Sequence, residues 1–332
     1  MSEPVTGPVV SEPVTGPVAC EQPVSGPVVS DAVTGRLVEV ADGVHAYLQG
    51  DGGWCLNNAG LVVGDDGQSL LIDTAATVRR AQELRTAVLA LAPEPPRTLV
   101  CTHFHGDHTF GNQLFPEALV IAHERTRSEM AAAGLGLTTL WPEVTWGELE
   151  LRLPEWTYRD GLTLRLGDVR VELIHLGPAA HTTNDTAVWL PGPRVLFAGD
   201  VLMSGVTPFC LMGSVAGSLD AMRRLRALEP AVIVPGHGPV GGPELIDANE
   251  AYFRWLADRA LQGTAAGLTP LQLARAEGAG PYAQLLDSER LVPNLHRAYA
   301  ELRGAAPGAP LDVGALFREM TEYHGALPVC RA

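Results

Sequence analysis

Hydrophobic and polar residues alternate over two stretches that follow the first 36 residues. The segment LVEVADGVHAYLQ (37–49) alternates around the turn sequence ADG, and AGLVVGDDGQSLLID (59–73) alternates around DDG. Alternation with a period of two, interrupted by Asp-Gly, is typical of two strands joined by a tight turn. Each segment therefore predicts a β-hairpin.

The pattern then changes to the helical period. In ATVRRAQELRTAVLALA (76–92) the apolar positions recur every three or four residues, and prolines follow at once. The predicted buried face consists of Val78, Ala81, Leu84, Val88 and Leu91. The next apolar run, RTLVC (97–101), predicts a short buried strand.

Strand patterns continue to about residue 243, and helical patterns follow them. We expect a strand at 118–123, a helix at 124–133, a hairpin at 162–176, a strand pair around 191–193 and a strand at 231–236. The simplest architecture is α+β: two stacked sheets with outer helices, followed by a helical C-terminal segment. The expected divisions are a disordered repetitive tail (1–35), the sheet domain (36–245) and the helical segment (246–332), which we expect to cover the active site.

The tail repeats a unit of about nine residues, as in EPVTGPVV, EPVTGPVA and EQPVSGPVV. Proline or glycine at every few positions opposes both helix and central strand, and so short a unit cannot bury an apolar face. We expect a disordered or extended arm without an essential role.

Composition narrows the classes of function. The chain has 332 residues and a formal charge of −15, which disfavours binding to nucleic acid or to anionic lipid. Five scattered cysteines without a CxxC pair fit a reducing compartment better than a disulfide framework. With no apolar run long enough to span a membrane, we expect a cytoplasmic protein.

The motif THFHGDH (102–108) carries the densest chemistry in the chain. His103, His105, Asp107 and His108 directly follow a predicted strand, where a loop can turn several side chains towards one point. Imidazole nitrogen and carboxylate oxygen together suit Zn, Mn or Fe. Three further candidates each come just after a predicted strand, namely His181, Asp200 and His237. Together these residues predict a site for two metal ions, with zinc as the first choice.

This arrangement resembles the metallo-β-lactamase superfamily over about residues 36–245, including LLIDTA around Asp73. The resemblance implies an αββα sandwich. It also implies that one metal is held by His103, His105 and His181, that the other is held by Asp107, His108 and His237, and that Asp200 bridges the two. Asp73 would orient the ligand loop. An aspartate at position 200, where the zinc β-lactamases of this fold have cysteine, argues against antibiotic hydrolysis.

Two metals in such a site activate a water molecule and polarise a carbonyl oxygen, which is the chemistry of acyl hydrolysis. Asp107 and Asp200 are the carboxylates that we expect to serve catalysis. No separate general acid is conspicuous near the motifs, and a thiolate leaves without one more readily than an amine does. A thioester is therefore the expected substrate.

A closer resemblance comes from stretches that a general hydrolase does not need. GGWCLNNAG, GLGLTTLWPEVTWG, HTTNDT, GDVLMSGVTPFCLMGSVAGSLDAM and PGHGPVGG are similar to the cyclase–thioesterases of bacterial aromatic polyketide pathways, of the actinorhodin second-ring cyclase type. The resemblance implies an aromatic polyketide held on an acyl carrier protein, aldol closure of the second ring, and hydrolytic release. One dinuclear centre can serve both steps, since the same metal can stabilise an enolate or an acceptor oxygen.

A flat substrate needs an apolar pocket, and the chain offers several aromatic and aliphatic residues for one. The candidates are Trp141, Trp146, Phe209, Leu211, Met212, Tyr252 and Trp255, with Phe253 beside them on a helix that we expect to act as a lid. Carrier proteins are usually acidic, so an arginine patch at Arg223, Arg224 and Arg226, or at Arg79 and Arg80, would have to offset the negative charge of this chain.

Three alternatives stay open. The first is a general hydrolase of glyoxalase II or lactonase type that acts on a small thioester or ester. The second is a redox member of the fold that uses iron, although the flavodiiron version needs a flavin domain for which this chain lacks the length. The third is a binding or scaffold protein without catalysis, against which the complete ligand set argues.

Overall fold

Both predicted hairpins are present in the first sheet. The computed structural model describes Met1, residues 35–92 and residues 94–332. Within these residues the first sheet has seven strands in sequence order: β1 (Arg36–Ala41), β2 (Val44–Leu48), β3 (Ala59–Val63), β4 (Ser69–Ile72), β5 (Thr98–Val100), β6 (Leu119–His123) and β7 (Trp156–Tyr158). Pairing is antiparallel from β1 to β4 and parallel from β4 to β7.

The second sheet has five described strands in the order β12-β11-β10-β9-β8. They are β8 (Gly161–Leu166), β9 (Val169–His175), β10 (Thr186–Leu190), β11 (Val195–Phe197) and β12 (Val232–Val234). Strands β11 and β12 are parallel, so both point their carboxyl ends in the same direction. The predicted hairpin at 162–176 is β8 and β9, and the pair around residue 192 is β10 and β11.

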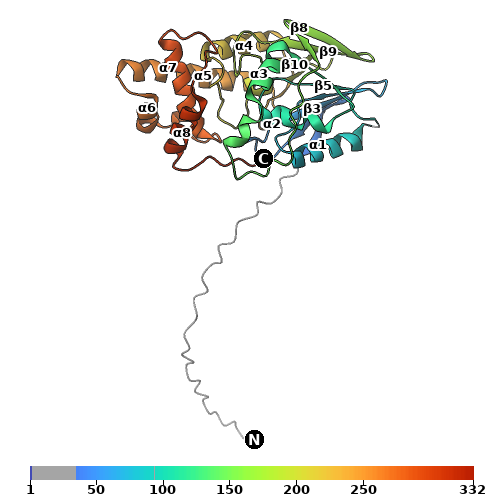
Figure 1. The fold of residues 1–332 in the computed structure, drawn as a ribbon, viewed down its shortest axis with the longest axis horizontal. Helices are drawn as coiled ribbons and strands as arrows, with labels where there is room; N and C mark the ends of the chain where they lie inside the picture. Colours follow the sequence, from blue (N-terminus) through green and yellow to red (C-terminus); the bar gives the residue numbers. More distant parts are fainter. Residues whose placement is uncertain (2–34, 93) are drawn as a thin grey trace. The chain divides into compact units, whose positions relative to one another are not determined.

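Alternation along the strands decides what each face of the first sheet covers. On β4, Leu70 and Ile72 pack into the core between the sheets, whereas Leu71 packs on the opposite face with Leu84 and Val88 of helix α1 (Val78–Leu91). The two sheets and their outer helices make the αββα sandwich of the metallo-β-lactamase fold, as predicted (Figure 1).

Helix α1 differs from its predicted face at one end. Thr77 caps it by accepting a hydrogen bond from the Arg80 amide, and Ala81, Leu84 and Val88 are buried. Leu91, which the period assigns to the buried face, is the last residue of α1 and is 46% exposed. Pro93, the predicted stop, and the predicted disordered tail, apart from its terminal residues Met1 and Gly35, lie outside the described residues.

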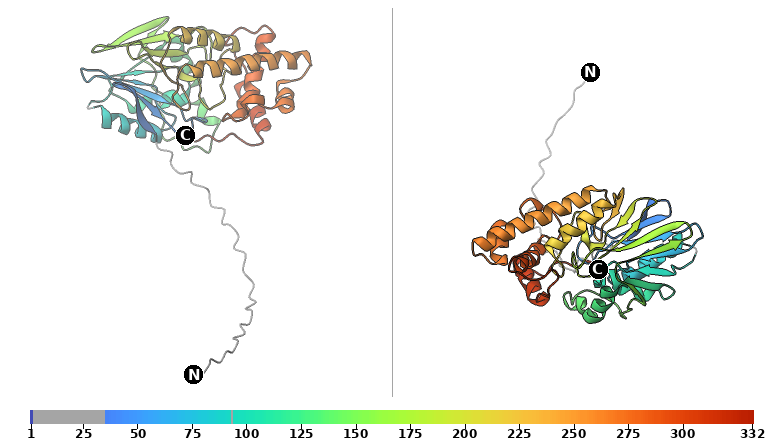
Figure 2. Two further views of the ribbon diagram at one scale, coloured as in Figure 1. Left: turned by 180° about the vertical axis from the view of Figure 1, so that it is seen from behind. Right: turned by 90° about the horizontal axis from the view of Figure 1, so that it is seen from above.

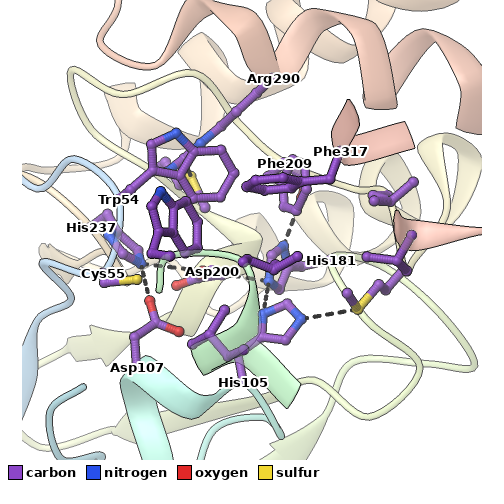
Figure 3. A pocket seen from close by; sticks show the side chains of 17 residues that line it. Trp54, Cys55, His105, Asp107, His181, Asp200, Phe209, His237, Arg290 and Phe317 are labelled. Carbon is purple, nitrogen blue, oxygen red and sulfur yellow. Dashed lines mark hydrogen bonds and ion pairs between the residues drawn. The ribbon is translucent and has the colours of Figure 1, made fainter. Parts of the chain in front are cut away.

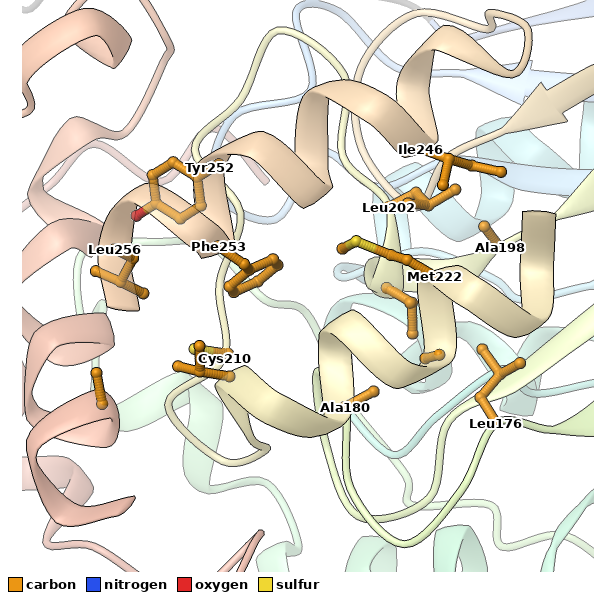
Figure 4. Close-up of a cluster of buried hydrophobic side chains, with 14 of the residues drawn as sticks. Leu176, Ala180, Ala198, Leu202, Cys210, Met222, Ile246, Tyr252, Phe253 and Leu256 are labelled. Atoms are coloured by element: carbon orange, nitrogen blue, oxygen red, sulfur yellow. The ribbon is translucent and has the colours of Figure 1, made fainter. Parts of the chain in front are cut away.

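Shorter helices occupy the connections of the sandwich. They are α2 (Gly106–Thr109), α3 (Glu124–Ala133) and α4 (Val215–Ala227), with 3₁₀ turns η1 (Phe110–Leu114), η2 (Gly136–Thr139) and η3 (Gly199–Val201). Helix α4 covers the outer face of the second sheet, where Met222 and Leu225 join the apolar cluster that Figure 4 shows.

The last part of the described chain is helical, as its periodicity predicts. It consists of α5 (Glu244–Ala265), α6 (Pro270–Glu277), η4 (Gly280–Tyr282), η5 (Ser288–Arg290), α7 (Leu291–Leu302) and α8 (Val313–His324). Helix α5 runs along α4, and α6 to α8 pack together beside the sandwich (Figure 2). None of the helices in the described part of the chain is both long and apolar enough to cross a membrane.

Candidate metal centre

Strand ends bring the predicted ligands together. Asp73 follows β4, the THFHGDH loop follows β5, and His237 follows β12, while Asp200 lies in η3 directly after β11. Because neighbouring parallel strands end at one edge of each sheet, these loops converge there. Gly236 permits the closest approach, since a Cβ at this position would overlap Asp200 Oδ1.

The donor atoms of the predicted ligands form two groups. His103, His105, His181 and Asp200 offer donor atoms that lie within 4.8 Å of one another, and Asp107, His108 and His237 form a second group under the same limit. We call these seven residues the donor cluster.

Asp200 faces both groups. Its Oδ2 lies 3.4 Å from His181 Nε2 and 3.4 Å from His237 Nε2, and its Oδ1 lies 3.1 Å from His108 Nε2. This position between the groups is the one that the resemblance gives to a bridging ligand.

Each imidazole uses its outer nitrogen in a separate hydrogen bond, which fixes the ring. His181 Nδ1 donates to the Phe209 carbonyl at 2.6 Å, and His237 Nδ1 donates to the Gly52 carbonyl at 2.9 Å. His105 is turned the other way, with Nε2 3.3 Å from the Met212 sulfur and Nδ1 towards the cluster. The inner nitrogen of each ring is thereby left to face the shared centre.

Asp73 occupies the orienting position that the resemblance implies. It accepts from His108 Nδ1 at 2.8 Å and from the Thr102 amide and hydroxyl, each at 2.7 Å. That hydroxyl also lies 3.0 Å from His103 Nδ1, so one carboxylate sets the orientation of two imidazoles. Its backbone is left-handed, with φ 58°, a conformation that Asp tolerates better than most residues.

Burial and charge suit the cluster to metal ions. Burial lowers the pKa of His105 to about 3 and holds the pKa of His103 well below its usual range, which keeps both rings neutral. Burial opposes charge on His237 too, but Asp200 and Asp107 raise its pKa to about 9, so this part of the cluster favours a positive charge, either a proton or a metal ion. His108 Nε2 and Asp200 Oδ1 are buried and lie 3.1 Å from each other, and neither has another hydrogen-bond partner among the described residues. These facing donor atoms fit a metal ion that they would share.

An apolar cavity opens over the donor cluster. Asp107, Asp200 and three of the imidazoles form its floor, and aromatic rings lie above them (Figure 3). The rings belong to Trp54, Trp141, Phe209 and Phe317, and we call them the aromatic layer. They touch one another: ring centroids are 5.3 Å apart for Trp54 and Trp141 and 5.1 Å apart for Trp141 and Phe317.

The structure places four of the seven predicted pocket residues on the cavity wall, namely Trp141, Phe209, Leu211 and Met212. Trp146 stands behind the wall, where its indole donates to the Trp141 carbonyl at 3.2 Å.

Tyr252 and Trp255 do not line this cavity, so the prediction that places them there, with their helix as the lid, is corrected. Tyr252 is buried in the core of the helical segment and receives a hydrogen bond from Asn294, and Trp255 packs against Tyr282. Helical periodicity identified them as apolar contacts of α5, but it could not tell which partner they contact.

The residues that the helical segment does contribute to the wall were not predicted. They are Arg290, Val313 and Phe317. Arg290 is buried and stacks on Trp54, with its guanidinium carbon 4.0 Å from the ring centroid. The motif GGWCLNNAG could have indicated Trp54 as a residue of the site, whereas no sequence pattern around Arg290 indicates such a role.

Comparison with known proteins agrees with this fold. The family model of the metallo-beta-lactamase superfamily matches residues 52–237. The chain is 25% identical to "Metallo-beta-lactamase type 2" of Bacteroides fragilis over 224 residues, which is 64% of this chain and 82% of that protein. It is 31% identical to "2,4-dinitroanisole O-demethylase subunit alpha" of Nocardioides sp. (strain JS1661) over 180 residues, 53% of this chain and about half (51%) of that protein. The solved structure of the metallo-beta-lactamase from Pontibacter korlensis superposes with a TM-score of 0.54 at 21% identity, covering 66% of this chain and 99% of that one.

Because the family model matches more than half of its residues, the chain belongs to the metallo-beta-lactamase superfamily. Its fold and its His and Asp donor cluster are those of a metal-binding hydrolase within this superfamily.

Proposed function

We propose that the protein is a dinuclear zinc cyclase and thioesterase. It would close the second ring of an aromatic polyketide, held on an acyl carrier protein, by aldol condensation, and then release the product by thioester hydrolysis. The observation that carries this proposal is the aromatic layer lying directly over the donor cluster, since flat apolar substrates stack on such rings.

The seven residues of the donor cluster would hold the two ions. When bound, such ions supply Lewis-acid stabilisation of a carbonyl or enolate oxygen and activate water. The protein's own part is to fix the ligands, through contacts such as that between Asp73 and His108, and to exclude bulk water with the aromatic layer.

The rest of the cavity wall supports a thioester. Apart from the donor cluster, Cys55 and Arg290 are the titratable residues among its described lining. The Cys330 thiol and burial raise the pKa of Cys55 well above its usual value, and guanidinium groups do not give up a proton in proteins, so neither side chain is a good proton donor to a leaving group. A thiolate leaves without such a donor, whereas an amine does not.

An aromatic substrate gains support from one relative. The O-demethylase subunit is named for 2,4-dinitroanisole, which contains an aromatic ring. This likeness is compatible with ring binding in the cavity and does not distinguish a polyketide from other aromatic compounds.

Docking of the carrier protein needs a surface other than the predicted arginine patches. Arg223 pairs with Asp220, and Arg226 pairs with Asp247 and Glu250. Arg79 pairs with Glu83, and Arg80 is buried. Most of these arginines are thus neutralised by acidic neighbours or inaccessible, and the carrier protein stays a proposal that rests on the sequence resemblance.

Two measurements test the proposed function. Elemental analysis of the purified protein should find about two zinc ions per chain. The enzyme should then convert a carrier-bound polyketide with one closed ring to a released two-ring product, with a kcat/KM at least about a hundredfold above that for a small acyl thioester. Rapid hydrolysis of the small thioester without ring closure would favour the general hydrolase, and one equivalent of iron would favour a redox enzyme.

A further inference from the structure

The segment that follows α8 returns to the cavity wall. We call residues 326–332 the strap; the chain enters it after Gly325, which ends α8 in a left-handed conformation with φ 87°. Two hydrogen bonds join the strap to the aromatic layer. The Trp141 indole donates to the Pro328 carbonyl at 2.7 Å, and the Arg331 amide donates to the Trp54 carbonyl at 3.4 Å.

Rigid parts of the sandwich hold the strap from its other side. The guanidinium of Arg80, which is buried on α1, donates to the Arg331 carbonyl, and the guanidinium of Arg331 pairs with Asp51. Cys330 lies in hydrogen-bonding contact with Cys55, which lines the cavity next to Trp54. The strap therefore connects the helical segment, the aromatic layer and α1.

The two tryptophans depend on the strap to different degrees. Trp54 is also fixed by Glu289, which accepts from its indole at 2.6 Å, and by the stacked Arg290. The indole N–H of Trp141 donates to the strap, and its ring packs on Trp54 and Phe317. Loss of the strap should therefore release Trp141 while Trp54 keeps its place.

We propose that the strap is a specificity determinant of the active site: it holds the Trp141 ring in the layer on which a flat aromatic acyl group stacks. Within the described part of the chain, its hydrogen bonds and its ion pair go to Arg80, Asp51 and the cavity wall, not to the donor cluster. The strap acts as a positioning element for substrate choice and leaves the reacting centre intact. This inference rests on the proposed thioester chemistry for its assay substrates.

The test compares the full chain with a variant that ends at Gly325, using the acetyl and 2-naphthoyl thioesters of one small thiol. For the naphthoyl thioester we expect KM to rise about tenfold and kcat to stay within about twofold, because the lost contact is with the bound rings. Turnover of the acetyl thioester should change by less than about twofold, and the metal content should not change.

Point variants test the same proposal if the truncated chain does not fold. Arg331→Ala should reproduce part of the rise in KM, and Arg331→Lys should restore some of it. Arg318→Ala, on the exposed side of α8, is the matched control and should behave as the wild type. Equal losses on both thioesters, or no change on the naphthoyl thioester, would overturn the proposal.

A separate measurement distinguishes failure of this inference from failure of the proposed function. If the wild-type enzyme cleaves neither thioester, the thioesterase assignment fails. In that case the role of the strap is decided by the affinity for 2-naphthoate, which is measured through the quenching of tryptophan fluorescence. The truncated chain should bind about tenfold more weakly, and equal affinity would refute the inference.

Discussion

The donor cluster and the aromatic layer lie against each other, yet they are built in opposite ways. All seven donors come from connections that follow strands of the two sheets, including the short helix α2 and the turn η3, and each imidazole is oriented by a further contact. The aromatic layer takes Trp54, Trp141 and Phe209 from three connections of the sandwich and Phe317 from α8. The sheets position the donors, and the helical segment completes the wall of the cavity above them.

This difference predicts different consequences of mutation. A change in the donor cluster should affect every substrate, because all reactions share the same centre. A change in the aromatic layer should affect substrates according to their size and planarity.

The largest effect is expected from Asp200→Ala. Both groups lose the carboxylate that lies between them, so thioester release and ring closure should each fall by on the order of a hundredfold or more. Paired assays of thiol release and cyclised product, with the metal content of each sample, measure this. Wild-type cyclisation beside abolished release would mean that the donor cluster does not serve both steps.

A smaller effect is expected from Asp73→Asn, because Asp73 is not a donor itself and only orients residues of the donor cluster. Asn tolerates the left-handed backbone at this position but cannot offer two carboxylate oxygens to His108 and Thr102. Metal affinity should fall by about 10- to 100-fold, as competition with a chelator would measure. The matched control is Asp42→Asn in an exposed turn, which should leave the affinity unchanged. An unchanged metal affinity for Asp73→Asn would show that the carboxylate of Asp73 is not needed to orient His108 and Thr102.

Trp141→Ala should separate the two regions most clearly. The KM for a flat carrier-bound substrate should rise about tenfold, while hydrolysis of a small thioester stays largely intact. Trp141→Phe keeps an aromatic ring but loses the hydrogen bond to the Pro328 carbonyl. Its KM for the flat substrate should therefore lie between those of the wild type and Trp141→Ala. Steady-state kinetics with both substrates decide the matter, and a parallel loss on both would remove the distinction between the regions.

The smallest effect on catalysis is expected from Trp255→Ala. Its ring packs on Tyr252 and Tyr282 and does not line the cavity, so the free energy of unfolding should fall by about 1–3 kcal/mol without a change in KM. Denaturant unfolding and kinetics on the same samples measure the two quantities. A selective rise in KM for the flat substrate would return α5 to the role of a lid.

The sequence by itself determined the elements and the donors. Alternation located both hairpins, and helical spacing located α1 and the C-terminal helices, because the period of buried positions follows from local geometry. The donor residues could be predicted because a group of imidazoles and carboxylates at successive strand ends is rare unless these side chains share a site.

Only the tertiary structure decided which apolar residues line the cavity over the donor cluster. Periodicity marks Tyr252, Trp255 and Phe317 alike as buried positions, but burial has no direction in a sequence. The packing of α8 and the strap places Phe317 over the metal centre, whereas α5 turns Tyr252 into the helical core. Arg290 illustrates the same limit, because its place beneath Trp54 depends on a contact between residues 236 positions apart. Contacts at such separation depend on how whole elements pack, and no local pattern encodes them.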